Sequence, residues 1–66
     1  MKTLTFNTDT RRWQIGEREL HCGACFKLYA DDGSLPAIQV RIEYNNQGWY
    51  LITPYGITKP SERKAE

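Results

Sequence analysis

The sequence lacks most of the features that mark secreted, membrane or disulfide-stabilised proteins. Its 66 residues include two cysteines, one histidine and three prolines, and no apolar run approaches the length of a membrane-spanning helix. The residues after Met1 contain no apolar stretch of the kind that forms the centre of a signal peptide. Two cysteines are also too few for a secreted disulfide scaffold. We therefore expect a cytoplasmic protein with reduced thiols and no contact with a membrane.

A strong excess of charge of either sign is also missing. Nine Lys and Arg residues against eight Asp and Glu residues leave a formal net charge of +1, which gives no overall attraction to nucleic acid. A chain this short forms one domain and buries only about 60% of the surface that its unfolded form exposes, so a deep catalytic cleft is not expected. Phosphate-binding loops and nucleophile-elbow motifs are absent from the sequence. We expect no enzyme activity and no cofactor.

The sequence does contain a clear β-hairpin over residues 38–53. Apolar and polar residues alternate over 38–44, which is the period of a half-buried strand, and the Asn-Asn-Gln-Gly run that follows is typical of a turn. A slip of one residue would move the apolar side chains to the wrong face, so the register is well defined. The predicted pairs are Tyr44 with Trp49, Ile42 with Leu51 and Val40 with Thr53.

A second hairpin is predicted at the start of the chain. Leu4 and Phe6 alternate with polar residues, and the same alternation returns from Trp13 to Ile15 after a polar turn. Pairing Phe6 with Trp13 sets Leu4 opposite Ile15, so that all four apolar side chains share one face. This hairpin is therefore expected to form one wall of the core.

A third strand, over residues 25–30, completes the predicted set. The Asp-Asp-Gly-Ser run after it breaks the strand, and Gly33 is expected to take a positive φ there. Five short strands without helical spacing predict an all-β fold, either a small five-stranded SH3-like barrel or a barrel-like curled antiparallel sheet. The domain is expected to span residues 1–58. Residues 59–66 have mixed charge and no aromatic or β-branched residue, so we expect a flexible C-terminal tail.

Strand parity identifies the side chains that face away from the core. Because successive side chains point to opposite faces of a strand, Lys27, Tyr29, Arg41 and Tyr50 are expected on one outer face. Tyr and Arg are enriched at the centres of protein-binding sites, and together they also form stacking surfaces for single-stranded nucleic acid. An ordinary solvated face with an Arg41–Glu43 ion pair is the alternative. These four residues are the candidate binding site.

The segment His21-Cys22-Gly23-Ala24-Cys25 is the candidate for metal or thiol chemistry. Cys22 and Cys25 have the spacing of two zinc ligands, and His21 is a potential third ligand. A structural zinc site needs four ligands, so this one would need a dimer or a carboxylate to complete it. Redox activity needs the first cysteine at a helix N-terminus, whereas this segment leads into a strand. Cysteines without a metal, and a surface histidine, are the favoured interpretation.

Several short blocks resemble a known family. The blocks Leu-His-Cys-Gly at residues 20–23, Arg-Ile-Glu-Tyr at 41–44 and Gly-Trp-Tyr-Leu at 48–51 follow one another in the same order. They resemble an uncharacterised small single-domain family found mostly in Gram-positive bacteria and their mobile elements. The resemblance covers nearly the whole chain except the tail, and departs from the family over residues 34–39, where a Trp is expected. The family has no known activity, so the resemblance implies no catalytic or binding residues.

The predicted function is that of a non-catalytic binding or adaptor module for a protein partner, acting as a monomer or a weak dimer. The first alternative is a nucleic-acid-binding accessory protein of a mobile element. The second is a zinc- or thiol-dependent protein that uses Cys22 and Cys25. Arg11 and Arg12 form a small basic patch in the first turn, and a solvated turn is the simplest interpretation of it.

Overall fold

The computed structural model describes residues 2–30, 32, 34 and 36–66. Over these residues the chain forms eight strands and no helix, so the prediction of an all-β protein is confirmed. The strands are β1 (Lys2–Asn7), β2 (Arg12–Ile15), β3 (Arg18–Glu19), β4 (Cys25–Leu28), β5 (Ile38–Asn45), β6 (Gly48–Thr53), β7 (Gly56–Thr58) and β8 (Arg63–Ala65). The expected positive φ of Gly33 lies outside the described residues. Within the described part of the chain, nothing resembles an apolar helix long enough to span a membrane.

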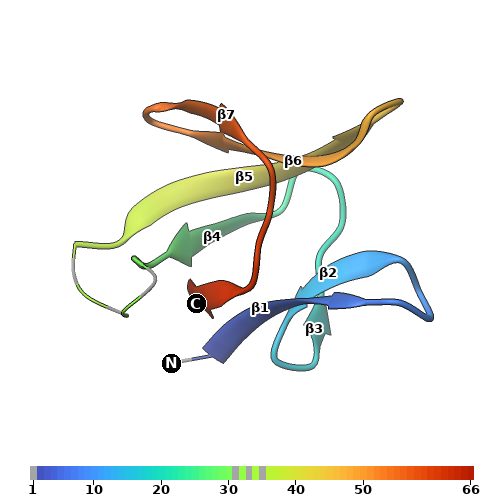
Figure 1. Ribbon diagram of the computed structural model, residues 1–66, viewed down its shortest axis with the longest axis horizontal. Helices are drawn as coiled ribbons and strands as arrows, with labels where there is room; N and C mark the ends of the chain where they lie inside the picture. Colours follow the sequence, from blue (N-terminus) through green and yellow to red (C-terminus); the bar gives the residue numbers. More distant parts are fainter. Residues whose placement is uncertain (1, 31, 33, 35) are drawn as a thin grey trace.

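All the strands belong to one antiparallel sheet in the order β3-β2-β1-β8-β4-β5-β6-β7. The sheet curls, so that β1, β2 and β3 lie below the layer made by β4 to β7, with β8 between them (Figure 1). The edge strands β3 and β7 pair with β2 and β6 and not with each other. The barrel-like curled sheet is therefore the form that the structure takes. In the described part of the chain the sheet is not closed into a barrel, because its two edge strands, β3 and β7, do not pair with each other.

Both predicted hairpins have the predicted register. The pairs are Phe6↔Trp13 and Leu4↔Ile15 in the first hairpin, and Tyr44↔Trp49 and Ile42↔Leu51 in the second. The ladder between β5 and β6 ends at Arg41↔Ile52, one pair short of the predicted Val40 and Thr53. The alternation of apolar residues was sufficient to set the register, because a slip would expose every apolar side chain of the strand.

The core lies inside the curl and draws on both parts of the sheet. Its buried members are Leu4, Ile15, Leu20, Phe26, Leu28, Val40, Ile42, Leu51 and Ala65. Trp13 and Trp49 pack against this cluster, but both stay half-buried. Each tryptophan contacts its cross-strand partner edge to face, at 5.4 Å between ring centroids for Phe6 and Trp13 and 4.8 Å for Tyr44 and Trp49. The two aromatic pairs thus border the core and reach the surface.

The C-terminal segment requires a correction. The expected flexible tail is wrong over Arg63–Ala65, which form β8 between β1 and β4. Ala65 is 0% exposed and pairs with Lys2 on one side and Leu28 on the other. Beyond it, Glu66 and Lys27 exchange two main-chain hydrogen bonds of 2.9 Å. Main-chain hydrogen bonds hold this strand in the sheet. Because every residue except proline has the same main-chain donor and acceptor, the side-chain composition of the segment did not predict the strand.

Candidate functional site

The predicted outer-face residues divide into two groups. Lys27 and Arg41 are exposed and Tyr50 is half-buried on the outer face, at positions set by the pairs Lys27↔Gln39 and Glu43↔Tyr50. Arg41 Nε lies 3.0 Å from Glu43 Oε2, so the charge of Arg41 is compensated on this face. An exposed ion pair of this kind contributes less than about 1 kcal/mol to stability.

Tyr29 lies on the same side of the sheet as Lys27, but its side chain is covered there rather than presented to solvent. It is only 7% exposed. Leu28 pairs with Ala65, so Lys27 stands opposite Glu66 and Tyr29 opposite Lys64, and the alternation of β4 continues through Tyr29. Its main chain is held by β8: its N–H donates to the Lys64 carbonyl at 3.0 Å, and its carbonyl accepts from Arg63 Nη2 at 2.8 Å. Its hydroxyl donates to the Glu66 carboxylate. That hydrogen bond, followed by burial and the negative charge of Glu66, raises the pKa of Tyr29.

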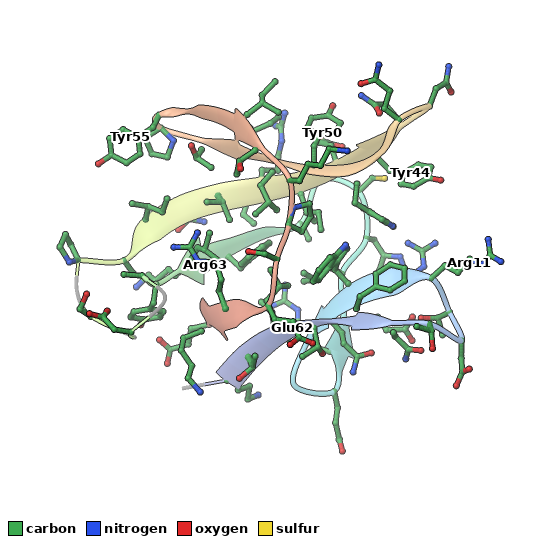
Figure 2. All side chains as sticks on the ribbon, in the orientation of Figure 1. Arg11, Tyr44, Tyr50, Tyr55, Glu62 and Arg63 are labelled. Carbon is green, nitrogen blue, oxygen red and sulfur yellow. The ribbon has the colours of Figure 1, made fainter. Side chains whose placement is uncertain are left out.

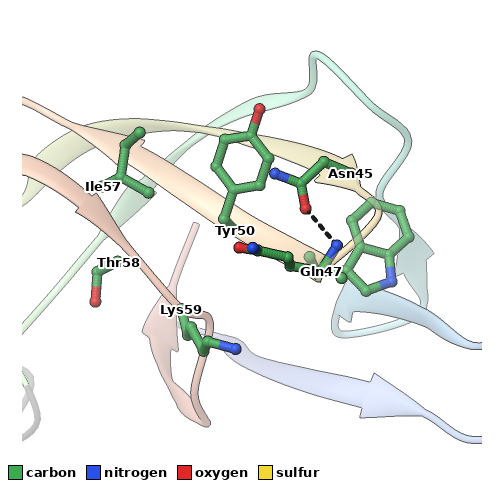
Figure 3. A pocket seen from close by; sticks show the side chains of 8 residues that line it. Asn45, Gln47, Tyr50, Ile57, Thr58 and Lys59 are labelled. Carbon is green, nitrogen blue, oxygen red and sulfur yellow. Dashed lines mark hydrogen bonds between the residues drawn. The ribbon is translucent and has the colours of Figure 1, made fainter.

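Beside Tyr50 the surface opens into a groove of about 410 Å³, which we name the outer groove (Figure 3). It is lined by Asn45, Gln47, Gly48, Trp49, Tyr50, Ile57, Thr58 and Lys59. The groove exists because β6 is longer than its neighbour. The pairing of β7 with β6 ends at Leu51↔Thr58, so residues 48–50 have β5 on one side and the groove on the other.

The lining of the outer groove is mixed, with the large side chains of Trp49, Tyr50 and Ile57 beside polar residues and one charge. Ile57 is 72% exposed, which is unusual for an isoleucine on a strand, and Tyr50 lies on the same side of the groove (Figure 3). Lys59 is the charged side chain among the lining residues. Of the described residues that line the groove, none carries a carboxylate, an imidazole or a thiol. The groove thus offers a bound molecule aromatic and aliphatic surface, side-chain amides, hydroxyl groups and one amine.

Three hairpin turns of the sheet share one local design. In each, a side-chain oxygen accepts a hydrogen bond from the backbone N–H two residues further on. The Asn7 oxygen accepts from Asp9, the Asn45 oxygen from Gln47 and the Thr53 oxygen from Tyr55. Each turn also contains a residue at positive φ: Gly48 at 109° and Gly56 at 123° are the first paired residues after two-residue turns, and Arg11 at 59° is the last residue of the longer first turn. Glycine adopts this conformation without steric cost, whereas another residue gives up about 1–2 kcal/mol. Arg11 is thus the exception among the three turns.

The turn that ends at Arg11 forms one wall of a second hollow of about 230 Å³, which we name the arginine hollow. Its lining residues are Thr10, Arg11, Arg12, Cys22, Tyr44 and Trp49. The Trp49 indole N–H donates to the Arg11 carbonyl at 3.1 Å, which joins the first turn to β6. The Arg12 guanidinium lies 5.9 Å from the centroid of the Trp49 ring, a cation–π distance. Tyr44, 57% exposed, forms the outer side of this aromatic pair.

The arginine hollow was not predicted as a site. The sequence showed Arg11 and Arg12 as a basic turn, and it showed Tyr44 and Trp49 as a cross-strand pair. Nothing in the local pattern places the first turn against the second hairpin, because that contact depends on the curl of the whole sheet. Figure 2 shows Arg11 and Tyr44 at the same end of the molecule, with Tyr50 on the opposite side of the β5–β6 hairpin.

The two cysteines point to different surfaces. Cys22 lines the arginine hollow, whereas Cys25 lies opposite Arg41 in the β4–β5 ladder and so shares the outer face. Both are free and exposed, and His21 is exposed beside them. No group of three or more His, Cys, Asp or Glu side chains that could hold a metal occurs among the described residues. The structure thus gives no support to a zinc site made by His21, Cys22 and Cys25 within one chain.

Comparison with known proteins identifies the family but not a relative of known activity. Neither the curated proteins nor the solved structures contain a match to this chain. A family model described as a domain of unknown function, DUF5348, matches residues 2–64. That match confirms the predicted resemblance to an uncharacterised small domain family, and it spans all the strands except the end of β8. The chain therefore belongs to the DUF5348 family of domains of unknown function.

Proposed function

We propose that this domain is a non-catalytic binding module that takes an extended segment of a protein partner into the outer groove. One observation carries the proposal: β6 continues over residues 48–50 past the end of its pairing with β7, and the space beside it is open. An unpaired strand edge offers main-chain donors and acceptors to an incoming strand. A partner segment would lie in line with β7 and pair with the exposed part of β6.

The side chains around the open edge favour a partner segment that is partly apolar. Ile57 and Tyr50 present apolar surface that gains by being covered, at about 25 cal/mol per Å² removed from water. Tyrosine also contributes a large contact area with few rotatable bonds, which is why it is common at binding sites. Alternate residues of the bound strand would face this surface.

The charges favour an acidic partner. Lys59 lines the outer groove, and Lys27 is exposed on the same outer face, while Arg41 is already paired with Glu43. Among the residues that line the outer groove, Lys59 is positive and none is negative. Complementary charge on a partner raises the rate of association and selects against basic segments.

The size of the groove sets the expected strength of binding. A groove of about 410 Å³ accepts a few side chains, so the buried area falls below the roughly 1,200 Å² of a standard interface. We propose a weak and reversible contact, with a dissociation constant in the micromolar range or above. We further propose that the domain is an SH3-like interaction module of the cytoplasm and acts as a monomer or weak dimer.

The proposal is tested with a ¹⁵N-labelled protein and a peptide of eight residues that alternates Val and Glu. Saturable shifts of the backbone amide signals of Trp49, Tyr50 and Thr58 are expected, because these residues border the open edge. A Val–Lys peptide should bind at least fivefold more weakly. A Val–Glu peptide with N-methylated amides on one edge should not bind, because it cannot pair as a strand. Equal binding of all three peptides, or no binding, would refute the proposal.

The tyrosines of this region supply a matched pair of variants. Tyr50→Ala removes a side chain that lines the outer groove, whereas Tyr55→Ala removes one that is 86% exposed in the turn before β7. We expect Tyr50→Ala to weaken binding of the Val–Glu peptide at least fivefold, and Tyr55→Ala to change it by less than twofold. Equal losses would show that the peptide does not use the groove.

A further inference from the structure

We propose that the arginine hollow is a second binding site, separate from the outer groove, and that its ligand is single-stranded nucleic acid. The hollow joins two arginines, an exposed tyrosine and a tryptophan at one end of the molecule. These are the two kinds of group that single strands require, cations for the phosphates and aromatic rings for the bases. The inference does not rest on the protein partner proposed for the outer groove.

The identity of residue 11 is the first argument. Among the described residues, Arg11 is the one residue other than glycine with a positive φ, at 59°. A side chain in this conformation is strained, and such strain is concentrated at functional positions. The turn itself needs only the backbone of residue 11, whose N–H donates to the Asn7 carbonyl at 2.7 Å. Its exposed guanidinium is not required by the turn and is free to serve a ligand.

The charge of the hollow is the second argument. Among the described residues, neither Arg11 nor Arg12 forms an ion pair, whereas Arg41 on the outer face pairs with Glu43. The lining contains no carboxylate. Two adjacent uncompensated guanidinium groups attract phosphate, which they bind through paired N–H donors.

The aromatic pair is the third argument, and it distinguishes nucleic acid from an acidic peptide. Trp49 is held in place by its hydrogen bond to the Arg11 carbonyl and by the Arg12 guanidinium near its ring. Tyr44 packs edge to face on this fixed ring and stays 57% exposed, so it presents a ring surface to solvent. A base stacks on such a surface, whereas a carboxylate does not need it. Bases inside a duplex are already stacked, which favours single strands.

The test follows ¹⁵N-labelled protein during titration with the single-stranded oligonucleotide dT6 at low salt. Because the Trp49 indole N–H bonds to Arg11, its signal reports directly on the hollow. A saturable shift of this signal and of the Tyr44 amide is expected, with little change at Ile57. A twelve-base-pair duplex and a hexaglutamate peptide should bind at least fivefold more weakly. No saturable shift, shifts centred on Ile57, or equal binding of hexaglutamate would overturn the proposal.

Variants of the cations test the phosphate contact. Arg11→Gly removes the side chain and suits the backbone conformation, so the fold is retained, and Arg12→Gln removes the second cation. Two contacted phosphates predict a slope of about −1.4 for the logarithm of affinity against the logarithm of salt concentration, and each variant should reduce that slope by about 0.7. Arg18→Gln, a change in exposed β3, is the control and should leave the slope unchanged. Equal slopes for all three variants would overturn the proposal.

Variants of the tyrosines test the stacking contact. Tyr44→Ala should weaken dT6 binding at least fivefold, because it removes the exposed ring of the hollow. Tyr55→Ala, which removes a more exposed ring elsewhere, should change binding by less than twofold. Equal affinities of the two variants would show that dT6 binds through charge alone and would contradict a base-stacking site.

Discussion

The outer groove and the arginine hollow both include Trp49 in their lining, yet they are built in different ways. The outer groove is a main-chain feature, because it exists where β7 stops and β6 continues. The arginine hollow is a side-chain feature, because it exists where the first turn carries two arginines against an aromatic pair. A chain too small for a deep cleft can thus carry two distinct surface hollows if its strands and turns end at different places.

The two surfaces also differ in what holds them. The outer groove depends on the β5–β6–β7 ladder, and its side chains lie outside the core. The arginine hollow depends on a contact between the two parts of the curled sheet, the hydrogen bond from the Trp49 indole to the Arg11 carbonyl. Substitutions in the core should therefore disrupt both surfaces. Loss of the hydrogen bond between Trp49 and Arg11 should disrupt the arginine hollow alone.

The largest effect is expected from the core strand that supports both surfaces. Ile42→Ala removes a fully buried side chain from β5 and should lower the free energy of unfolding by about 2–5 kcal/mol. Ile57→Ala is the matched control, since the same side chain is exposed in β7 and its loss should cost less than about 0.5 kcal/mol. Urea denaturation of both variants measures the difference. Equal costs would contradict the placement of the core.

The next largest loss of stability is expected at β8, which pairs with β1 and β4 and so joins the two parts of the curled sheet. Ala65→Asp places a carboxylate where no side-chain surface is exposed, and should lower the free energy of unfolding by about 3 kcal/mol. Lys64→Asp changes the charge of the exposed neighbour and should cost less than about 0.5 kcal/mol. Thermal unfolding compares them. If Ala65→Asp is as stable as Lys64→Asp, the C-terminal segment is a tail after all.

A smaller loss of stability is expected from a change at Trp49, and this change should affect the two surfaces unequally. Trp49→Phe keeps an aromatic ring but removes the N–H that donates to Arg11, and should cost about 1 kcal/mol of stability. It should weaken binding at the arginine hollow more than at the outer groove. Trp13→Phe, in the other aromatic pair, is the control for the change in ring size. The separation fails if Trp49→Phe weakens both sites equally.

The smallest predicted effect on stability depends on pH and arises at Tyr29, whose main chain pairs with Lys64 of β8. The pKa of Tyr29 is raised above its ordinary value of 10.0, first by the hydrogen bond to Glu66 and then by burial and by the charge of that carboxylate. The folded chain therefore holds this proton more tightly than the unfolded chain does. The stabilisation is complete below about pH 10 and is lost as the pH rises through the raised pKa.

Tyr29→Phe removes the group that titrates. The stability of the native sequence should fall more steeply between pH 9 and pH 11 than that of the variant, as measured by the urea midpoint. Glu66→Gln should lower the pKa of Tyr29, because it removes the carboxylate that accepts the hydrogen bond. Identical pH profiles for the native sequence and Tyr29→Phe would contradict this account of the contact.

The sequence predicted those parts of the fold that side-chain periodicity determines. The register of both hairpins followed from alternation alone, because the apolar residues Leu4, Phe6, Ile42 and Leu51 leave one arrangement that buries a common face. The side-chain directions of Lys27 and Arg41 followed from the same rule. The register with β8 keeps Tyr29 on that face too, but the sequence did not show that its side chain is buried and bonded to Glu66.

The parts that were missed depend on contacts between distant segments. The sequence Arg-Lys-Ala of β8 has no strand pattern, and the strand forms because β1 and β4 both offer main-chain partners. The arginine hollow requires the first turn to meet the second hairpin, which only the curl of the sheet brings about. One feature of the hollow has no counterpart in the sequence pattern: Arg11 takes a positive φ, which a sequence alone does not show.

The central claim is that two independent surfaces bind different ligands, and one experiment tests it directly. The Val–Glu peptide and dT6 are each titrated into Tyr50→Ala and Arg11→Gly, with amide-resolved NMR as the readout. We predict that Tyr50→Ala loses at least fivefold in affinity for the peptide and keeps its affinity for dT6, and that Arg11→Gly shows the reverse pattern. If either variant loses affinity for both ligands to the same degree, the surfaces are not independent and the account is wrong.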